Sequence, residues 1–215
     1  TTVCLPLMLE PQDVTVTGPN EYFVYTVTVP AYTVVVKVIS TLNIPLSNAT
    51  VRLIYSMETA SEPVFGVPSL TYTTIDLGTF ILDAEGKSSE IVLPASGTLR
   101  AILISWRDLP INKDLGTVTV TGNGAFSFTY TDLGKVIIKV TGSRPFILPN
   151  AKVVIKYNGK TVESGNTDES GVFTAILPAD TYIVEVFFEG YSNSTSVIVH
   201  ANTTTNIVIQ LSLIH

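Results

Sequence analysis

The sequence contains few of the side chains that usually carry chemistry. Its 215 residues include one cysteine, one tryptophan and two histidines. Neither a Gly-x-Ser-x-Gly elbow nor a Cys/His spacing typical of a metal site occurs. His200 and His215 have no acid–base partner near them in the sequence. We therefore expect a protein that is not an enzyme and that holds no metal and no cofactor.

Charge is also sparse: only 14% of the residues are charged, compared with about 25% in an average soluble domain. The net charge of −6 with scattered lysines argues against a nucleic-acid partner, which requires a clustered basic face. The apolar stretches 22–36 and 197–214 are interrupted by Thr, Pro or Asn, so neither gives the continuous run of about 18 residues that spans a membrane. The hydrophobic fraction of 46% is high enough to form a packed core, which excludes a disordered chain.

Three glycosylation sequons indicate the compartment. Asn48, Asn193 and Asn202 each begin an Asn-x-Ser/Thr sequence, the acceptor for N-linked glycans on secreted proteins. Cys4 is the only cysteine, so no internal disulfide can form. The chain begins at Thr1 without a charged-then-apolar leader, and we expect a mature chain whose signal sequence has been removed. The sequence therefore predicts an extracellular, glycosylated surface protein.

An internal repeat and short alternating runs define the fold class. Val and Thr are abundant, and Gly or Pro interrupts the runs, which is typical of an all-β protein. Five segments recur in the same order: residues 14–18 match 118–122, 34–38 match 136–140, 48–55 match 150–157, 83–86 match 168–171, and 93–94 match 177–178. A repeat of about 95 residues has the usual size of a sandwich. We expect two tandem related β-sandwich domains of the Ig-like or prealbumin-like kind.

The second copy resembles carboxypeptidase-regulatory-type domains. The resemblance is carried by residues 148–153, 168–173, 177–182 and 190–191. It covers residues 135–213 and, more faintly, 34–105, and it implies a seven-stranded prealbumin-like sandwich with a structural or adhesive role. Asp180 stands where the family usually has Gly, and Asp tolerates a left-handed backbone better than most residues.

Two Asp-x-x-Gly stretches, at residues 83–86 and 168–171, lie between alternating runs. Asp in the first and Gly in the fourth position favour a type I turn. A calcium loop would need several further oxygen ligands at short spacing. We therefore interpret both stretches as turns.

The two copies differ at their ends. We expect residues 13–108 to form the first sandwich with an insertion around 56–82, residues 109–116 to be a linker, and residues 117–215 to form the second sandwich. After residues 99–105 the first copy continues only with a short charged stretch interrupted by Pro110. The first sandwich is therefore expected to lack one or two strands and to present an open acceptor groove with unpaired backbone groups.

Residues 1–12 match nothing in the second copy and have the pattern of a spare strand. Val3, Leu5, Leu7 and Leu9 occupy alternate positions, so one face of such a strand is apolar. Insertion of this strand into the groove of a second copy would give head-to-tail polymers, because the contact is heterologous.

This plan resembles the archaeal thread-type filament subunit, which assembles by donor-strand complementation. The resemblance implies a structural subunit of an extracellular, pilus-like surface filament whose partners are identical subunits. The alternative is a monomeric secreted adhesion, carbohydrate-binding or surface-layer-associated β-sandwich protein.

An internal isopeptide bond is a further possibility that related adhesin domains imply. The candidates are Lys139, Asn206 and the neighbouring acid Glu185. Strand alternation turns Lys139 and Glu185 away from the core, whereas the bond needs both groups desolvated together. The pattern therefore disfavours the bond, and the intact mass of the chain would decide.

Overall fold

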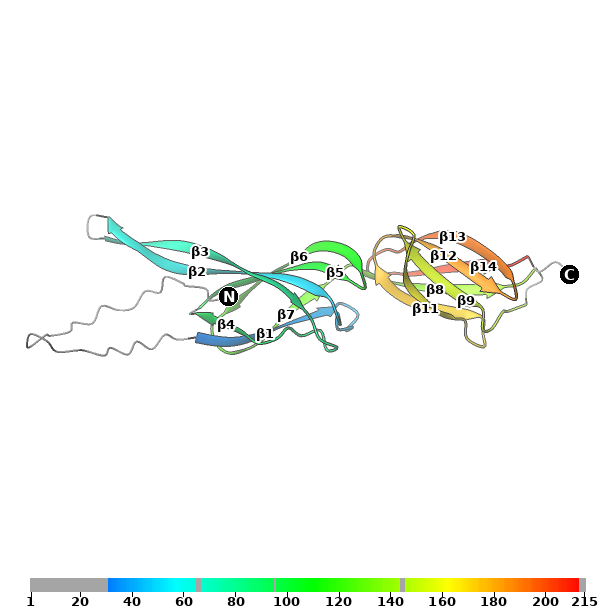
Figure 1. The fold of residues 1–215 in the computed structure, drawn as a ribbon, viewed down its shortest axis with the longest axis horizontal. Helices are drawn as coiled ribbons and strands as arrows, with labels where there is room; N and C mark the ends of the chain where they lie inside the picture. Colours follow the sequence, from blue (N-terminus) through cyan, green and yellow to red (C-terminus); the bar gives the residue numbers. More distant parts are fainter. Residues whose placement is uncertain (1–30, 65–66, 95, 144–145, 213–215) are drawn as a thin grey trace, which may run out of the picture.

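The computed structural model describes residues 31–64, 67–94, 96–143 and 146–212, which form two β-sandwiches stacked end to end in an elongated rod (Figure 1). This arrangement confirms the all-β, tandem-sandwich fold class. The expected donor strand, residues 1–12, lies outside the described residues.

The first sandwich has a three-stranded sheet, β4-β1-β7, facing a four-stranded sheet, β3-β2-β5-β6. β7 pairs in parallel with β1, whereas β4 pairs with it antiparallel. The strands are β1 (Ala31–Ser40), β2 (Thr50–Val64), β3 (Val67–Ile81), β4 (Ile91–Pro94), β5 (Gly97–Trp106), β6 (Leu109–Val120) and β7 (Gly124–Tyr130).

The second sandwich repeats this topology. Its sheets are β11-β8-β14 and β10-β9-β12-β13, and β14 pairs in parallel with β8 as β7 does with β1. The strands are β8 (Leu133–Thr141), β9 (Lys152–Tyr157), β10 (Lys160–Asn166), β11 (Val172–Pro178), β12 (Thr181–Phe188), β13 (Tyr191–Ile198) and β14 (Thr204–Gln210).

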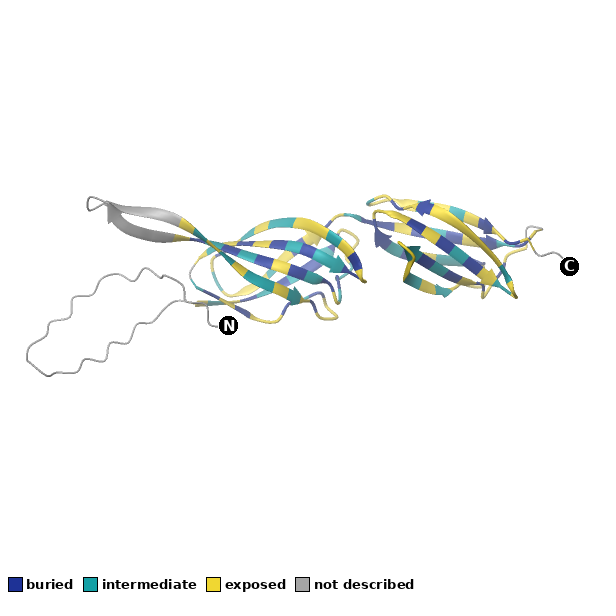
Figure 2. Cartoon of the chain, turned by 45° about the horizontal axis from the view of Figure 1, so that its top comes forward, coloured by how far each residue is buried: buried dark blue, intermediate teal, exposed yellow. Residues whose placement is uncertain are grey.

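Each sandwich is held by alternating apolar side chains. Val34, Val36 and Val38 of β1 are fully buried, and Val136 and Ile138 of β8 occupy the same positions in the second core. Figure 2 shows the resulting alternation of buried and exposed residues along the strands. Burial of each such side chain contributes about 1.5–3 kcal/mol before the entropy of ordering is subtracted.

The expected domain boundaries are corrected at the end of the first copy. Residues 109–116, expected to be a linker, belong to strand β6, and β7 follows it in the same sandwich. The first sandwich thus has seven strands within the described residues, and the expected lack of one or two strands is wrong. Residues 117–130, expected in the second sandwich, complete the first one.

The local chemistry explains the correction. β6 is an edge strand, where Pro110 does not interrupt a ladder on its open side. The charged stretch accommodates a bulge in which the backbone N–H of Gly116, at a φ of +91°, donates to the Asp114 carboxylate at 3.0 Å. The composition of β6, a polar and bulged edge strand, is therefore similar to that of a linker.

The insertion expected around 56–82 is a long hairpin. β2 and β3 have 15 residues each, whereas their counterparts β9 and β10 have 6 and 7. The hairpin projects past the end of the first sandwich, on the side away from the second (Figure 1).

Candidate functional site

The described residues offer no obvious site for chemistry. They contain no group of three or more His, Cys, Asp or Glu side chains that could hold a metal ion. Nor does the described part of the chain include a helix of sufficient length and hydropathy to cross a membrane. The most elaborate set of contacts lies where the two sandwiches meet, and we call this set the junction.

The β5–β6 hairpin places an apolar side chain of the first sandwich in the core of the second. Arg107 and Asp108 form its two-residue turn, with φ values of +51° and +61°, as a type I′ turn requires. Leu109 follows directly, is 4% exposed and packs in the second hydrophobic core. In return, Ile176 of β11 packs against the first core. The two cores are therefore in contact through the junction.

Arg107 makes polar contacts beside this apolar contact. Its guanidinium lies 4.6 Å from the ring centroid of Trp106. It also donates to the Glu163 carboxylate at 2.5 Å and to the Ile176 carbonyl oxygen at 3.3 Å. An exposed ion pair alone contributes little. The guanidinium, however, is held by an aromatic face, a carboxylate and a carbonyl, which fixes the angle between the hairpin and the second sandwich.

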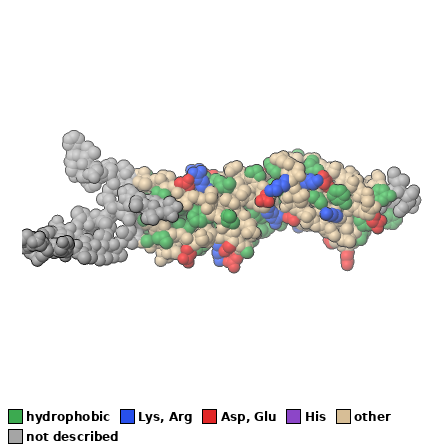
Figure 3. Space-filling model, viewed as in Figure 1, with side chains coloured by type: hydrophobic (Ala, Val, Ile, Leu, Met, Phe, Trp, Pro, Cys, Tyr) green, Lys and Arg blue, Asp and Glu red, His purple; other side chains and the backbone are tan. Residues whose placement is uncertain are grey.

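Two further ion pairs flank the junction. Lys160 lies 3.1 Å from Asp108, and Lys113 lies 2.9 Å from Asp132 in the segment that connects the sandwiches. The hydrogen bond from Lys113 holds the pKa of the Asp132 carboxyl below its ordinary value. Charged side chains of both signs accordingly lie beside one another near the middle of the rod (Figure 3).

Tyr130 ends β7 beside the connecting segment. Burial, with smaller contributions from the nearby Asp132 and Asp180 carboxylates, raises the pKa of the Tyr130 hydroxyl to about 12. This hydroxyl therefore stays neutral at physiological pH. The Tyr130 side chain packs in the first hydrophobic core.

Asn202 connects the sandwiches on the other side of the junction. Its side-chain Oδ1 accepts a hydrogen bond from the Thr41 hydroxyl at 2.7 Å, and its Nδ2 donates to the Thr131 carbonyl at 3.0 Å. Its backbone N–H donates to the Leu133 carbonyl at 2.7 Å. The φ of +56° at Asn202 is in a region that Asn adopts more readily than most residues.

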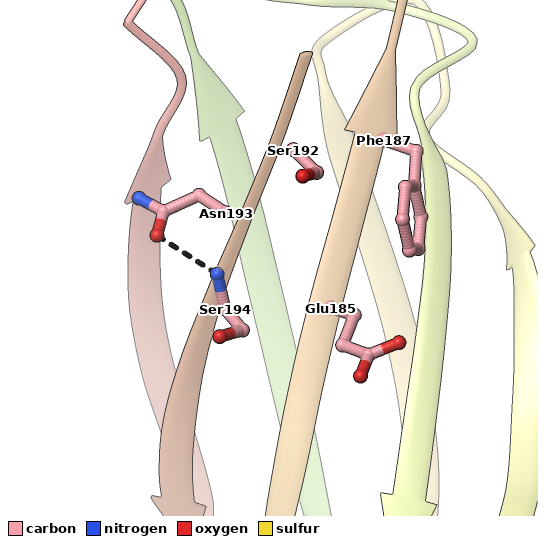
Figure 4. A pocket seen from close by; sticks show the side chains of 5 residues that line it. All are labelled: Glu185, Phe187, Ser192, Asn193 and Ser194. Carbon is pink, nitrogen blue, oxygen red and sulfur yellow. Dashed lines mark hydrogen bonds between the residues drawn. The ribbon is translucent and has the colours of Figure 1, made fainter. Parts of the chain in front are cut away.

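The three sequon asparagines are all exposed but differ in their contacts. Asn48 lies in the β1–β2 turn, and its side chain makes no hydrogen bond to a described residue. Asn193 lies on the edge strand β13; its Nδ2 donates to the Gln210 carbonyl at 2.8 Å and its Oδ1 accepts from the Ser194 N–H at 2.8 Å (Figure 4). Asn202 is part of the junction. Their glycosylation stays a prediction.

The structure places two of the isopeptide candidates on one sheet and separates the third, Glu185, from them. Lys139 and Asn206 project from the outer face of the β11-β8-β14 sheet, because the residues beside them point into the core. Glu185 projects from the outer face of the opposite sheet, where its carboxylate lies 2.7 Å from the Lys156 ammonium. The sandwich core separates Lys139 from Glu185, as the alternation of the strands predicted.

A shallow hollow of about 370 Å³ lies on the same outer face as Glu185. Phe187 of β12 and Ser192 and Ser194 of β13 line it with Glu185 (Figure 4). A second hollow of about 450 Å³ shares Phe187 and reaches the β12–β13 turn at Glu189 and Gly190. The outer face of this sheet is therefore open around Phe187.

The two lateral sides of the first sandwich are formed by different pairs of edge strands. β6 and β7 lie against each other, so β3 and β4 form the opposite side. β4 pairs with β1 only from Ala31 to Val34, whereas its counterpart β11 pairs with β8 along seven residues. Beyond that point residues 86–88 continue beside β1. The Ser88 N–H donates to the Val36 carbonyl and the Val38 N–H donates to the Gly86 carbonyl, both at 2.8 Å, and the Val36 N–H donates to the Ser88 hydroxyl at 3.0 Å.

The apolar side chains of β3, which is the edge strand of the opposite sheet, are incompletely buried. Ile75, Leu77 and Phe80 of β3 pack against the first core but are only partly buried, whereas Leu53 and Tyr55 of the central strand β2 are fully buried. We call this side, bounded by β3 and β4, the lateral opening.

The sequence interpretation missed the junction. The signal for it in the sequence is the stretch Trp106 to Leu109, in which two turn residues separate alternating runs. This stretch corresponds to Phe188 to Tyr191 at the β12–β13 turn. A hairpin here would have placed Leu109 at the end of the first sandwich and would have removed the expected linker.

Comparison with known proteins supports the second sandwich most directly. Residues 134–212 match the carboxypeptidase regulatory-like domain family, which confirms the resemblance found in the second copy. No curated protein matches the chain.

Solved structures similar to the chain include bacterial pilins. The shaft pilin SpaA of Lactobacillus rhamnosus GG has a TM-score of 0.42 and 13% identity, over 86% of this chain and 100% of that one. A minor pilin of Streptococcus agalactiae has a TM-score of 0.36 and 9% identity, over 86% and 97%. The Bacillus anthracis TIE protein has a TM-score of 0.36 and 17% identity, over 85% of this chain and 34% of that protein, so the chain spans about a third of it. Similarity at this level concerns the β-sandwich fold only.

Proposed function

We propose that the protein is a structural subunit of an extracellular surface filament and that it has no enzymatic activity. The observation that carries this proposal is the junction, which fixes two similarly oriented sandwiches end to end in a rod (Figure 1). A rigid rod with different surfaces at its two ends suits head-to-tail assembly, since a heterologous contact does not close on itself. The partners are identical subunits, and the sequons suit a glycosylated, cell-surface location.

The N-terminal strand is proposed to join successive subunits. Val3, Leu5, Leu7 and Leu9 would pack in the lateral opening of the neighbour, and the strand backbone would pair with the free edge of β4. Because the first sandwich already has seven strands, the donated strand would extend a sheet and would not replace a missing strand. Partly buried Ile75 and Phe80 support this location.

Deletion and paired substitutions test this proposal. Deleting residues 1–10 should abolish filaments that negative-stain microscopy shows for the wild-type protein. Leu7→Arg should block assembly, because an unpaired charge would be buried. Met8→Arg is the matched control and should be milder, since position 8 lies on the opposite face of a strand. Filaments that survive the deletion would contradict strand donation.

The alternative, a monomeric secreted adhesion or carbohydrate-binding protein, is favoured by one feature. The Phe187 ring lies on an open outer face beside the hydroxyls of Ser192 and Ser194, and aromatic and hydroxyl groups are both suited to contact sugars. Discrete particles of native material, with no filaments, would support this alternative.

A further inference from the structure

We infer that the free ends of the rod form a second junction between subunits. In it, the second sandwich of one subunit docks on the first sandwich of the next copy, with the same geometry as the contact between the two sandwiches within one chain. This inference rests on the proposed filament function and adds a packing surface to strand donation. The partner is a second copy of this chain, and the surface is the end of the rod and not the lateral opening.

The repeat defines which residues correspond at the two ends. Ser40 N–H donates to the Ile44 carbonyl, and Gly142 N–H donates to the Phe146 carbonyl, both at 2.9 Å. The loop that follows β8 therefore repeats the loop that follows β1. The first of these loops lies in the junction, where Thr41 contacts Asn202. The loop after β8 lies at the opposite end of the second sandwich.

Two apolar residues at the end of this second loop are exposed. Phe146 and Ile147 are 65% and 46% exposed, whereas their counterparts Ile44 and Pro45 in the first sandwich are partly buried. An adjacent pair of exposed apolar side chains at one end of a rod favours a contact surface over a solvated loop.

The opposite end of the rod exposes an apolar residue at the corresponding position. Val92 of β4 pairs with Thr33 as Ile176 of β11 pairs with Lys135, so Val92 corresponds to Ile176. Ile176 packs against the first sandwich across the junction, whereas Val92 is 67% exposed. Ile176 is thus covered by the junction, whereas its counterpart in the first sandwich, Val92, is exposed.

The hairpins at the two ends also correspond. The Arg107–Asp108 turn lies against the β9–β10 hairpin through Glu163 and Lys160. Its counterpart, the Glu189–Gly190 turn, has the hollow of about 450 Å³ beside it. The counterpart of the β9–β10 hairpin is the long β2–β3 hairpin, which projects from the free end of the first sandwich (Figure 1). In the second junction this hairpin would lie along the hollow.

Cysteine trapping in assembled filaments tests the second junction. In the repeat, Ser143 corresponds to Thr41, and Thr121, which precedes β7, corresponds to Asn202, which precedes β14. The counterpart of the Thr41–Asn202 contact would therefore lie between Ser143 of one subunit and Thr121 of the next. In full-length chains that carry Cys4→Ser, the pair Ser143→Cys and Thr121→Cys should form disulfides between subunits on oxidation. A ladder of covalent oligomers on a denaturing, non-reducing gel is the expected result.

Two controls make the trapping decisive. The pair Thr41→Cys and Asn202→Cys should close within one chain and shows whether the junction geometry permits a disulfide. The pair Ser143→Cys and Thr174→Cys, with Thr174 exposed in the middle of β11, should give no ladder. If the intrachain pair closes and filaments form but the ladder is absent, the second junction is wrong. If wild-type protein forms no filaments at all, the proposed function fails instead.

A substitution pair gives an independent measurement. Phe146→Asp should leave strand donation possible but should produce filaments that bend more, measured as a shorter persistence length in micrographs. Val208→Asp is the matched control, because Val208 is equally apolar and exposed but lies on a sheet face of the same sandwich. Equal persistence lengths for the two variants would overturn the inference.

Discussion

The Thr41 hydroxyl donates a hydrogen bond of 2.7 Å to the side-chain oxygen of Asn202 and so connects the first sandwich to the second. The amide nitrogen of Asn202 donates in turn to the Thr131 carbonyl in the connecting segment. The side chain of Asn202, in the second sandwich, thus contacts both the first sandwich and the segment that connects the two sandwiches. An arrangement of this kind resists bending between the two sandwiches.

Replacing Asn202 should loosen the junction. Asn202→Ala removes both side-chain hydrogen bonds and strains a residue with positive φ, so we expect a loss of about 1–3 kcal/mol in unfolding free energy. Thr41→Ala removes only one bond and should reduce stability by about 0.5–1.5 kcal/mol. Urea unfolding measures both, and small-angle scattering should show a wider range of interdomain angles for Asn202→Ala. Equal scattering from this variant and wild type would show that the other junction contacts, those of Leu109 and Arg107, set the angle without Asn202.

Leu109 should be the most important apolar residue of the junction. Because it is buried in the second core, Leu109→Ala should decrease the unfolding free energy by about 2–5 kcal/mol. Leu42→Ala is the control, since Leu42 is 41% exposed and its truncation should change stability by no more than about 0.5 kcal/mol. Hydrogen exchange should rise in the second sandwich of Leu109→Ala, although the substitution is in a strand of the first. Exchange confined to the first sandwich would contradict this assignment.

The three sequons should differ in glycan occupancy. A glycan on Asn202 would disturb the hydrogen bond from Nδ2 to Thr131 and would project from the junction, whereas Asn48 makes no such bond to a described residue. We therefore expect the highest occupancy at Asn48 and the lowest at Asn202 in native material, measured by mass spectrometry of glycopeptides. Full occupancy of Asn202 would show that the junction accommodates a glycan there.

The sequence alone predicted the parts of the fold that local chemistry determines. The Asp83–Gly86 and Asp168–Gly171 turns are confirmed, with Gly N–H to Asp carbonyl distances of 3.1 and 2.9 Å. Asp180, which stands where the family usually has Gly, does not need a left-handed backbone: its φ is not positive, and its carboxylate accepts the Thr181 N–H at 2.7 Å.

The parts that depend on tertiary context were not predictable in the same way. β6 lies at a sheet edge, where charge and proline are tolerated, so its composition did not distinguish a strand from a linker. Asn48 illustrates a second ambiguity. Its counterpart Asn150 has a similar φ, +61° against +57°, but begins no sequon. Asn at this position is therefore explained by the left-handed backbone, and its use as a glycan acceptor is a separate question.

The last prediction concerns stability in acid. Hydrogen bonds from Arg52, Arg100 and Lys113 lower the pKa values of their carboxylate partners. These partners are Asp76, Asp114 and Asp132. A carboxyl group whose pKa is lower in the folded state stabilises the fold above its unfolded pKa, about 3.9 for Asp. This stabilisation is lost as the pH falls through the lower, folded pKa.

The loss should be small, because the seven ion pairs of the described residues all have side chains at least 25% exposed, and exposed pairs contribute little. We therefore expect a cooperative melt that persists in strong acid, with a modest decrease of Tm that begins below about pH 4. Asp132→Asn should flatten this dependence more than Asp76→Asn, because Asp132 is the less exposed of the two. Calorimetry from pH 7 to about pH 2 measures both effects. A collapse of Tm that begins above the ordinary carboxyl range would instead require buried ion pairs or a titrating group other than these three aspartates.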